Sequence, residues 1–144
     1  KSIPANRRML LIHNVKATKE DIATIEQHFT NGVYWVLCPE SNRFISRTEP
    51  PVETLRNVGV KIAIGTDSLA SARHLSMVEN MRLLGDIPLD ELLIWATRNG
   101  AEALGLESSL GDIRVGTTPG IVVIEGADLQ NMRVTDQTRS RRII

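Results

Sequence analysis

The sequence has few of the residues that mark several common classes of protein. It contains one cysteine, Cys38, which excludes an internal disulfide framework and suits a reducing compartment, so we expect a cytoplasmic protein. Its 17 basic and 17 acidic residues give a formal net charge of zero, so no excess of positive charge indicates binding to nucleic acid or to an anionic membrane. No apolar run approaches the roughly 20 residues that span a bilayer, and we expect no secretory signal. The 144 residues suffice for one ordinary domain.

Short apolar runs alternate with amphipathic segments along the first hundred residues. Three apolar runs predict buried strands, at 8–15, 33–38 and 60–65. Helical spacing, capping residues and Pro-to-Gly boundaries predict four helices, at 18–29, 50–59, 75–85 and 88–106. Strands that are apolar throughout and are separated by helices indicate an α/β fold with a parallel sheet.

The last forty residues have a different character, with frequent glycines and short β-branched runs. The runs Ile121–Ile124 and Arg133–Thr135 predict antiparallel β structure, a small appendage to the α/β part. The basic residues Arg139, Arg141 and Arg142 are best explained as a solvated strand edge.

Polar residues follow each of the three predicted strands. His13 ends the first strand, the segment CPESN with Ser41 and Asn42 follows the second, and Asp67 follows the third. In parallel α/β folds ligands gather at the carboxyl ends of the strands, so these side chains are predicted to share one edge. Each also has an ordinary role open to it: a hydrogen-bonded core histidine, a turn, or a loop cap. Cys38 is expected to be an inert buried thiol.

Five ordered segments resemble the amidohydrolase superfamily, within its metal-dependent deaminase and chlorohydrolase branch. They are LLIHNV, VLCPESNRF, GVKIAIGTDSLAS, MVENMRLL and ATRNGAEALGL. The pair CPxSN and GTDSLAS is most similar to deaminases of adenine nucleosides, including those of S-adenosylhomocysteine and aminodeoxyfutalosine type. The tail GDIRVGTTPGIVVIEG resembles the segment where a small β-sandwich resumes after the barrel, except that Pro119-Gly120 replaces the usual Ala-Asp pair.

The resemblance implies a partial (β/α)8 barrel. Residues 1–106 would contain strands six to eight with their helices, and residues 107–144 a β segment of a composite sandwich. On this basis His13 hydrogen-bonds the attacking metal-bound water, and Asp67 is a metal ligand that accepts its proton. The implied reaction is hydrolytic deamination of an adenine-nucleoside-like heteroaromatic by metal-bound hydroxide, with one divalent ion, zinc in first place and iron as the alternative. Asn42, Ser68 and Ser71 would line the substrate pocket.

The chain departs from the family in its histidines. The family has a His-x-His pair, a later metal-binding His and an acid/base Glu, whereas this sequence has three histidines and no His-x-His. His28 is expected to face solvent and His74 to act as a cap or surface residue. One Asp and one strand-end His cannot supply the three or more ligands of a catalytic site, and three strands cannot close a barrel.

We therefore read the chain as the C-terminal part of an amidohydrolase. Alone it is expected to be inactive and to bind no metal tightly, and its open sheet edge calls for a partner, either another copy or the N-terminal part of the same protein. A second hypothesis is a non-catalytic half-barrel that binds a partner or a nucleoside. Within the enzymes, guanine- or cytosine-type deaminases and triazine-type chlorohydrolases stay open.

Overall fold

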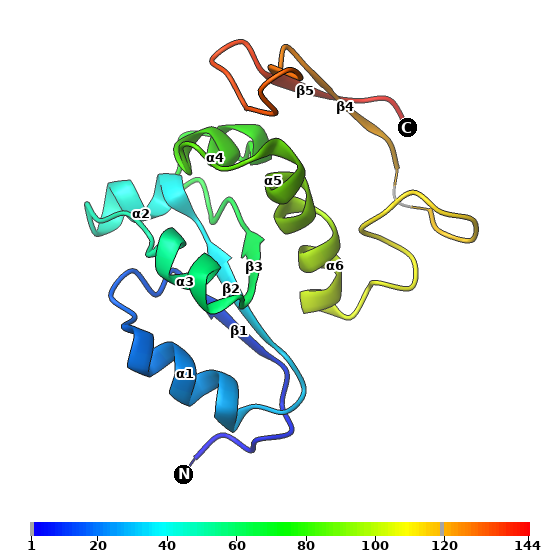
Figure 1. Ribbon diagram of the computed structural model, residues 1–144. Helices are drawn as coiled ribbons and strands as arrows, with labels where there is room; N and C mark the ends of the chain where they lie inside the picture. Colours follow the sequence, from blue (N-terminus) through cyan, green and yellow to red (C-terminus); the bar gives the residue numbers. More distant parts are fainter. Residues whose placement is uncertain (1, 119) are drawn as a thin grey trace.

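A computed structural model of the chain describes residues 2–118 and 120–144. Within these residues there are two sheets, a parallel sheet of three strands and an antiparallel pair (Figure 1). The parallel sheet has the order β1-β2-β3 and contains β1 (Met9–Ile12), β2 (Val33–Leu37) and β3 (Lys61–Ile64). The three predicted strands and their parallel pairing are thus confirmed, but β1 is exposed in part and is not buried as predicted.

Helices connect the strands and continue after the third one. They are α1 (Lys19–His28), α2 (Pro39–Ile45), α3 (Val52–Val58), α4 (Met77–Leu83), α5 (Leu89–Ala96) and α6 (Arg98–Leu104). The predicted capping box of α1 is present, with Thr18 and Asp21 bonded reciprocally. Gly59 ends α3 in the left-handed conformation, with φ 79°.

One predicted helix was wrong, and one open alternative was not realised. The single helix predicted over 88–106 is divided at Thr97, which has φ −126° and ψ −79° and separates α5 from α6. The segment CPESN, for which a turn was one open alternative, begins α2, with Pro39 in the first helical turn. Proline is favoured there because its missing N–H would have no partner at that position.

The main core lies on one face of the parallel sheet. Val33, Trp35 and Leu37 alternate along β2 and therefore point to the same side. In register, Trp35 faces Ile62 of β3. Side chains from α1, α3 and α5 complete this cluster, among them Ile22, Leu55, Leu92 and Trp95. The tight packing of this face holds the carboxyl ends of the strands in place.

The first strand is covered only in part. Its neighbour is β2 on one side, and within the described residues no strand pairs with its other edge. Leu10 and Ile12, which point to the face opposite the main core, are 37% and 51% exposed. Apolar side chains on an edge strand are a hazard for aggregation unless they are covered.

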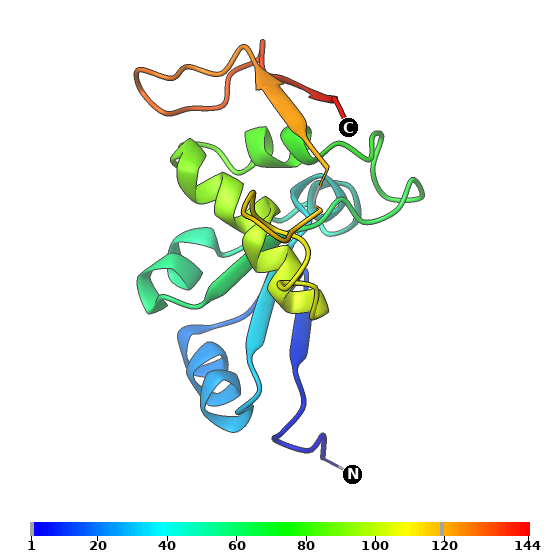
Figure 2. The same cartoon turned by 90° about the vertical axis from the view of Figure 1, so that its right-hand side faces the viewer.

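The antiparallel pair consists of β4 (Val122–Glu125) and β5 (Arg139–Arg142). The predicted antiparallel appendage is thus confirmed, and the basic run forms its exposed second strand. The run 133–135 is not a strand and makes one isolated bridge, between Asp128 and Arg133. Figures 1 and 2 both place the pair beyond α4, at the end of the molecule away from the N-terminus.

Arg82 of α4 connects this pair to the helices. Its guanidinium donates hydrogen bonds of 3.0 Å to the carbonyls of Thr135 and Thr138.

In residues 2–118 and 120–144 no helix is long and apolar enough to cross a membrane. The boundary predicted between residues 106 and 107 stays a prediction.

Candidate active site

The carboxyl ends of the three parallel strands bring His13 and Asp67 together. His13 directly follows β1, and Asp67 comes three residues after β3. Although 54 positions separate them in the numbering, Nε2 of His13 lies 3.7 Å from Oδ2 of Asp67. Both side chains are partly open, at 38% and 29% exposure. A histidine and a carboxylate thus share one accessible position on this edge of the sheet.

Both residues have left-handed backbone conformations. The φ angles are 71° at His13, 44° at Asn14 and 59° at Asp67. Such a conformation costs a non-glycine residue roughly 1–2 kcal/mol and persists where the surrounding structure enforces it, often at functional sites. The backbone N–H of His13 still donates to Val36 at 3.0 Å, so the strand ladder reaches the residue itself.

Two buried serines hold the Asp67 carboxylate. The hydroxyl of Ser41 donates to Oδ2 at 2.6 Å, and that of Ser71 donates to the same oxygen at 2.7 Å. The Ser41 bond, and then the Ser71 bond, hold the pKa of Asp67 below its ordinary value, while partial burial opposes them and the backbone N–H of Ser68 adds a smaller lowering. Asp67 is therefore ionised at neutral pH.

Asn42 holds the other partner of the pair. Its Oδ1 lies 2.8 Å from Nδ1 of His13, and its side chain is 1% exposed. Ser41 and Asn42 are consecutive residues in the first turn of α2. One helical turn after β2 therefore contacts both the histidine after β1 and the aspartate after β3.

The sequence placed Ser41 at this edge of the sheet but did not predict its hydrogen bond to Asp67, because a turn was an open role for CPESN. The available signal was Pro39 straight after a strand, which is typical of the first residue of a helix. Cys38, just before it, is buried, and burial first and the nearby Asp67 charge second raise the pKa of its thiol to about 11. This agrees with an inert thiol.

Of the two predicted serines in the loop after β3, only Ser71 uses its hydroxyl to bond the Asp67 carboxylate. Ser68 is exposed, and its hydroxyl accepts a 3.3 Å bond from the N–H of Ala70, so it shapes the loop. Ser71 is 7% exposed and is the one that reaches Asp67. His28 and His74 are both exposed and do not join the cluster, as predicted.

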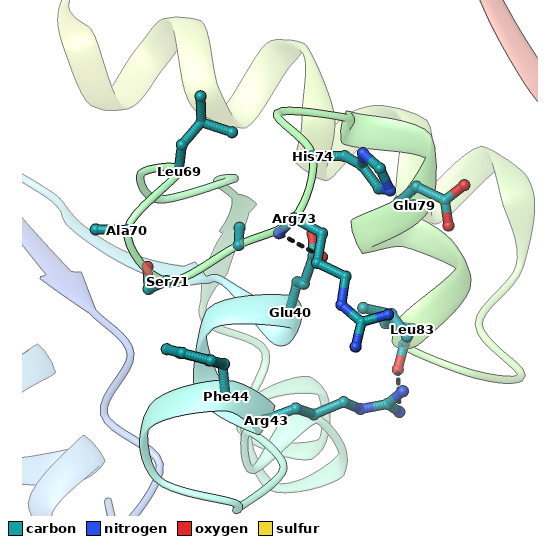
Figure 3. A pocket seen from close by; sticks show the side chains of 11 residues that line it. Glu40, Arg43, Phe44, Leu69, Ala70, Ser71, Arg73, His74, Glu79 and Leu83 are labelled. Atoms are coloured by element: carbon teal, nitrogen blue, oxygen red, sulfur yellow. Dashed lines mark hydrogen bonds between the residues drawn. The ribbon is translucent and has the colours of Figure 1, made fainter.

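A hollow adjoins the cluster. It has a volume of about 840 Å³ between α2, the loop after β3 and α4, and Ser71 belongs to its wall (Figure 3). Phe44 and Leu69 line it and are 71% and 67% exposed. Arg73 and His74 also line it. A molecule reacting at Asp67 could therefore extend over apolar side chains past Ser71.

The described residues fit a metal ion only in part. The Asp67 carboxylate is an oxygen ligand of the kind zinc accepts. Yet residues 2–118 and 120–144 contain no group of three or more His, Cys, Asp or Glu side chains that could hold an ion. A catalytic zinc site uses three protein ligands, which is more than the described residues bring together around Asp67.

Three known proteins are similar to this chain over most of its length. The 5-methylthioadenosine/S-adenosylhomocysteine deaminase of Moorella thermoacetica is 33% identical over 128 residues, 81% of this chain and 29% of that protein. The aminofutalosine deaminase of Helicobacter pylori in complex with methylthio-coformycin superposes with a TM-score of 0.76 at 26% identity, over 97% of this chain and 38% of that one. An adenosine deaminase of Xanthomonas campestris with bound zinc gives 0.73 at 30% identity, over 84% and 29%.

The chain spans less than a third of the length of these curated relatives. The model of the amidohydrolase family matches residues 3–144. The chain therefore belongs to the amidohydrolase family.

Proposed function

We propose that this chain supplies the last three barrel strands and part of the active site of a metal-dependent deaminase of adenine-nucleoside-like substrates. The observation that carries the proposal is the His13–Asp67 pair, 3.7 Å apart on the carboxyl edge of a parallel sheet. The relatives named as deaminases of adenine nucleosides support the substrate class.

The uncovered side of the sheet supports the barrel. About eight strands close one, and β1 offers an unpaired edge with Leu10 and Ile12 exposed beside it. Strands from additional polypeptide, either the N-terminal part of the same protein or another subunit, would pair there. In this proposal residues 1–106 belong to the barrel and 107–144 to a β-sandwich.

The reaction adds water to the ring carbon that bears an amino group and releases that group as ammonia. A divalent ion, zinc or alternatively iron, would supply the Lewis acid that activates water at neutral pH, with Asp67 as one ligand. Asp67 is suited to take up a proton because it is ionised and lies beside His13. His13 would hold the water in place.

The hollow beside Asp67 is the proposed place for the substrate. Ser71 connects the two, since it donates to Asp67 and also lines the hollow. Exposed Phe44 and Leu69 would cover an apolar ring face. Ser68 and Asn42 stay predicted substrate contacts, although the burial of Asn42 favours another role.

The first test is to read the gene region upstream of this segment. A His-x-His pair followed by a later His and a Glu would provide the outstanding ligands and the acid/base group. Their absence would favour the non-catalytic half-barrel instead.

The second test is an assay of the complete protein with zinc and adenine nucleosides, following the change in ultraviolet absorbance on deamination. Asp67→Ala should abolish turnover and lower the bound zinc, while Asp90→Ala, which removes an exposed carboxylate in the first turn of α5, should do neither. A purified 144-residue chain that binds one ion tightly and deaminates by itself would overturn the proposal.

A further inference from the structure

We propose that Asn42 is a positioning residue that holds His13 in one tautomer, with a proton on Nδ1 and with Nε2 directed at Asp67. Its catalytic meaning rests on the function proposed above. The tautomer itself rests on the contact between Oδ1 of Asn42 and Nδ1 of His13, which is 2.8 Å long.

The chemistry of the amide decides which ring nitrogen carries the proton. A carbonyl oxygen only accepts hydrogen bonds, so Nδ1 of His13 must be the donor. In the neutral ring Nε2 is then the acceptor, and it lies 3.7 Å from Oδ2 of Asp67. Asn42 and Asp67 thus lie at the two ring nitrogens of His13.

Two neighbouring residues of α2 hold the side chains of Asp67 and His13. Ser41, which is fully buried, donates to Oδ2 of Asp67 at 2.6 Å. Asn42 follows it and bonds His13. The backbone of Asn42 is held by its own helix, through a 2.9 Å bond from its N–H to the carbonyl of Cys38. The distance between the two functional groups is therefore set by one rigid turn.

Burial of Asn42 is costly to the fold, which points to a role beyond packing. The side chain is 1% exposed, and its Nδ2 has no hydrogen-bond partner within the described part of the chain. A buried amide without a partner lowers stability. An apolar residue of similar size would fill the space without this cost, so the bond from His13 to Oδ1 is what the asparagine contributes.

Imidazole nitrogen spectra of the 15N-labelled chain at pH 8 test the tautomer directly. The sequence has three histidines, and a His13→Gln variant assigns the signal of His13. We expect wild-type His13 to carry its proton on Nδ1. Asn42→Ala should give the mixture of an unconstrained ring, and Asn42→Asp should keep the Nδ1 proton because a carboxylate oxygen also accepts. The control Asn57→Ala removes an exposed asparagine of α3 and should change nothing.

Two results would overturn the inference: a proton on Nε2 of wild-type His13, or an unchanged tautomer in Asn42→Ala. If Asn42→Ala does not fold, as judged by the fluorescence of the two tryptophans, the wild-type tautomer still decides.

The complete protein tests the catalytic meaning separately. There, Asn42→Ala should lower kcat by about 10- to 100-fold, the usual effect of losing an outer hydrogen-bond partner, with KM little changed and partial recovery in Asn42→Asp. An unchanged kcat would refute the positioning role. Absence of turnover in the wild type would refute the proposed function instead and leave the tautomer result standing.

Discussion

Replacing Ser41 with alanine removes a hydroxyl that lies 2.6 Å from Oδ2 of Asp67. A hydrogen bond to a charged group contributes about 1.5–3 kcal/mol. The low end applies here, because the Asp67 side chain is 29% exposed and keeps the bond from Ser71. We expect Ser41→Ala to lower the free energy of unfolding at pH 7 by roughly 1.5–2 kcal/mol.

The pH dependence has a definite sign. The pKa of Asp67 is lowered in the folded chain, by the Ser41 hydroxyl above all, so its stabilisation is present above the unfolded value of about 3.9 and is lost as pH falls through the folded value. Ser41→Ala raises the pKa of Asp67 back toward that ordinary value. The difference in stability between the wild type and Ser41→Ala should therefore be full at pH 7 and shrink below about pH 4.

Urea unfolding measured by tryptophan fluorescence provides the assay, since Trp35 and Trp95 are 1% and 5% exposed. A double-mutant cycle with Asp67→Asn isolates the bond: Ser41→Ala should cost clearly less once the carboxylate is gone. Ser108→Ala, at an exposed serine, should stay within about 0.5 kcal/mol of the wild type. An equal cost of Ser41→Ala in both backgrounds, or a difference that grows on acidification, would refute the reasoning.

Three further predictions concern the fold. Gly111 has φ 97°, and Gly111→Ala places a Cβ 2.8 Å from a side-chain carbon of α6. Gly116 has φ 92° and open space around it, so Gly116→Ala should cost only the roughly 1–2 kcal/mol of a left-handed backbone. Gly111→Ala should therefore destabilise the chain in thermal unfolding by more than Gly116→Ala does. Leu92→Ala, at a side chain that is 0% exposed, should cost about 2–5 kcal/mol in urea unfolding, whereas Ile94→Ala, at 43% exposure, should cost far less. Arg82→Ala removes the two 3.0 Å bonds to the loop before β5 and should speed amide exchange in β4 and β5 while α1 stays protected; equal protection of β4 and β5 in both proteins would contradict that role.

Most of the parallel sheet could be predicted from sequence, because buried strands are apolar on both faces and stand out between amphipathic helices. The second half of the antiparallel pair was indicated only as a solvated strand edge, without its partner strand. The strand Arg139–Arg142 is exposed throughout, so it has no alternation of apolar residues to reveal it. Its pairing with β4 is a long-range contact that local propensity does not contain.

Helix boundaries near the site depended on tertiary contacts in the same way. A continuous apolar stripe predicted one helix over 88–106, but Asn99 donates a 2.6 Å bond to the carbonyl of Ile62 at the edge of β3. The helix is interrupted at Thr97, two residues before Asn99.

The sequence by itself determined which reactive groups are present: an aspartate and a histidine at strand ends, in the order of a known family, and three histidines without a His-x-His pair. Which groups touch was decided by the tertiary structure alone. Ser41 reaches Asp67 across 26 positions, and Asn42 reaches His13 across 29. These contacts exist because parallel pairing brings the carboxyl ends of three separate strands to one edge, and no pattern within any one strand records that meeting.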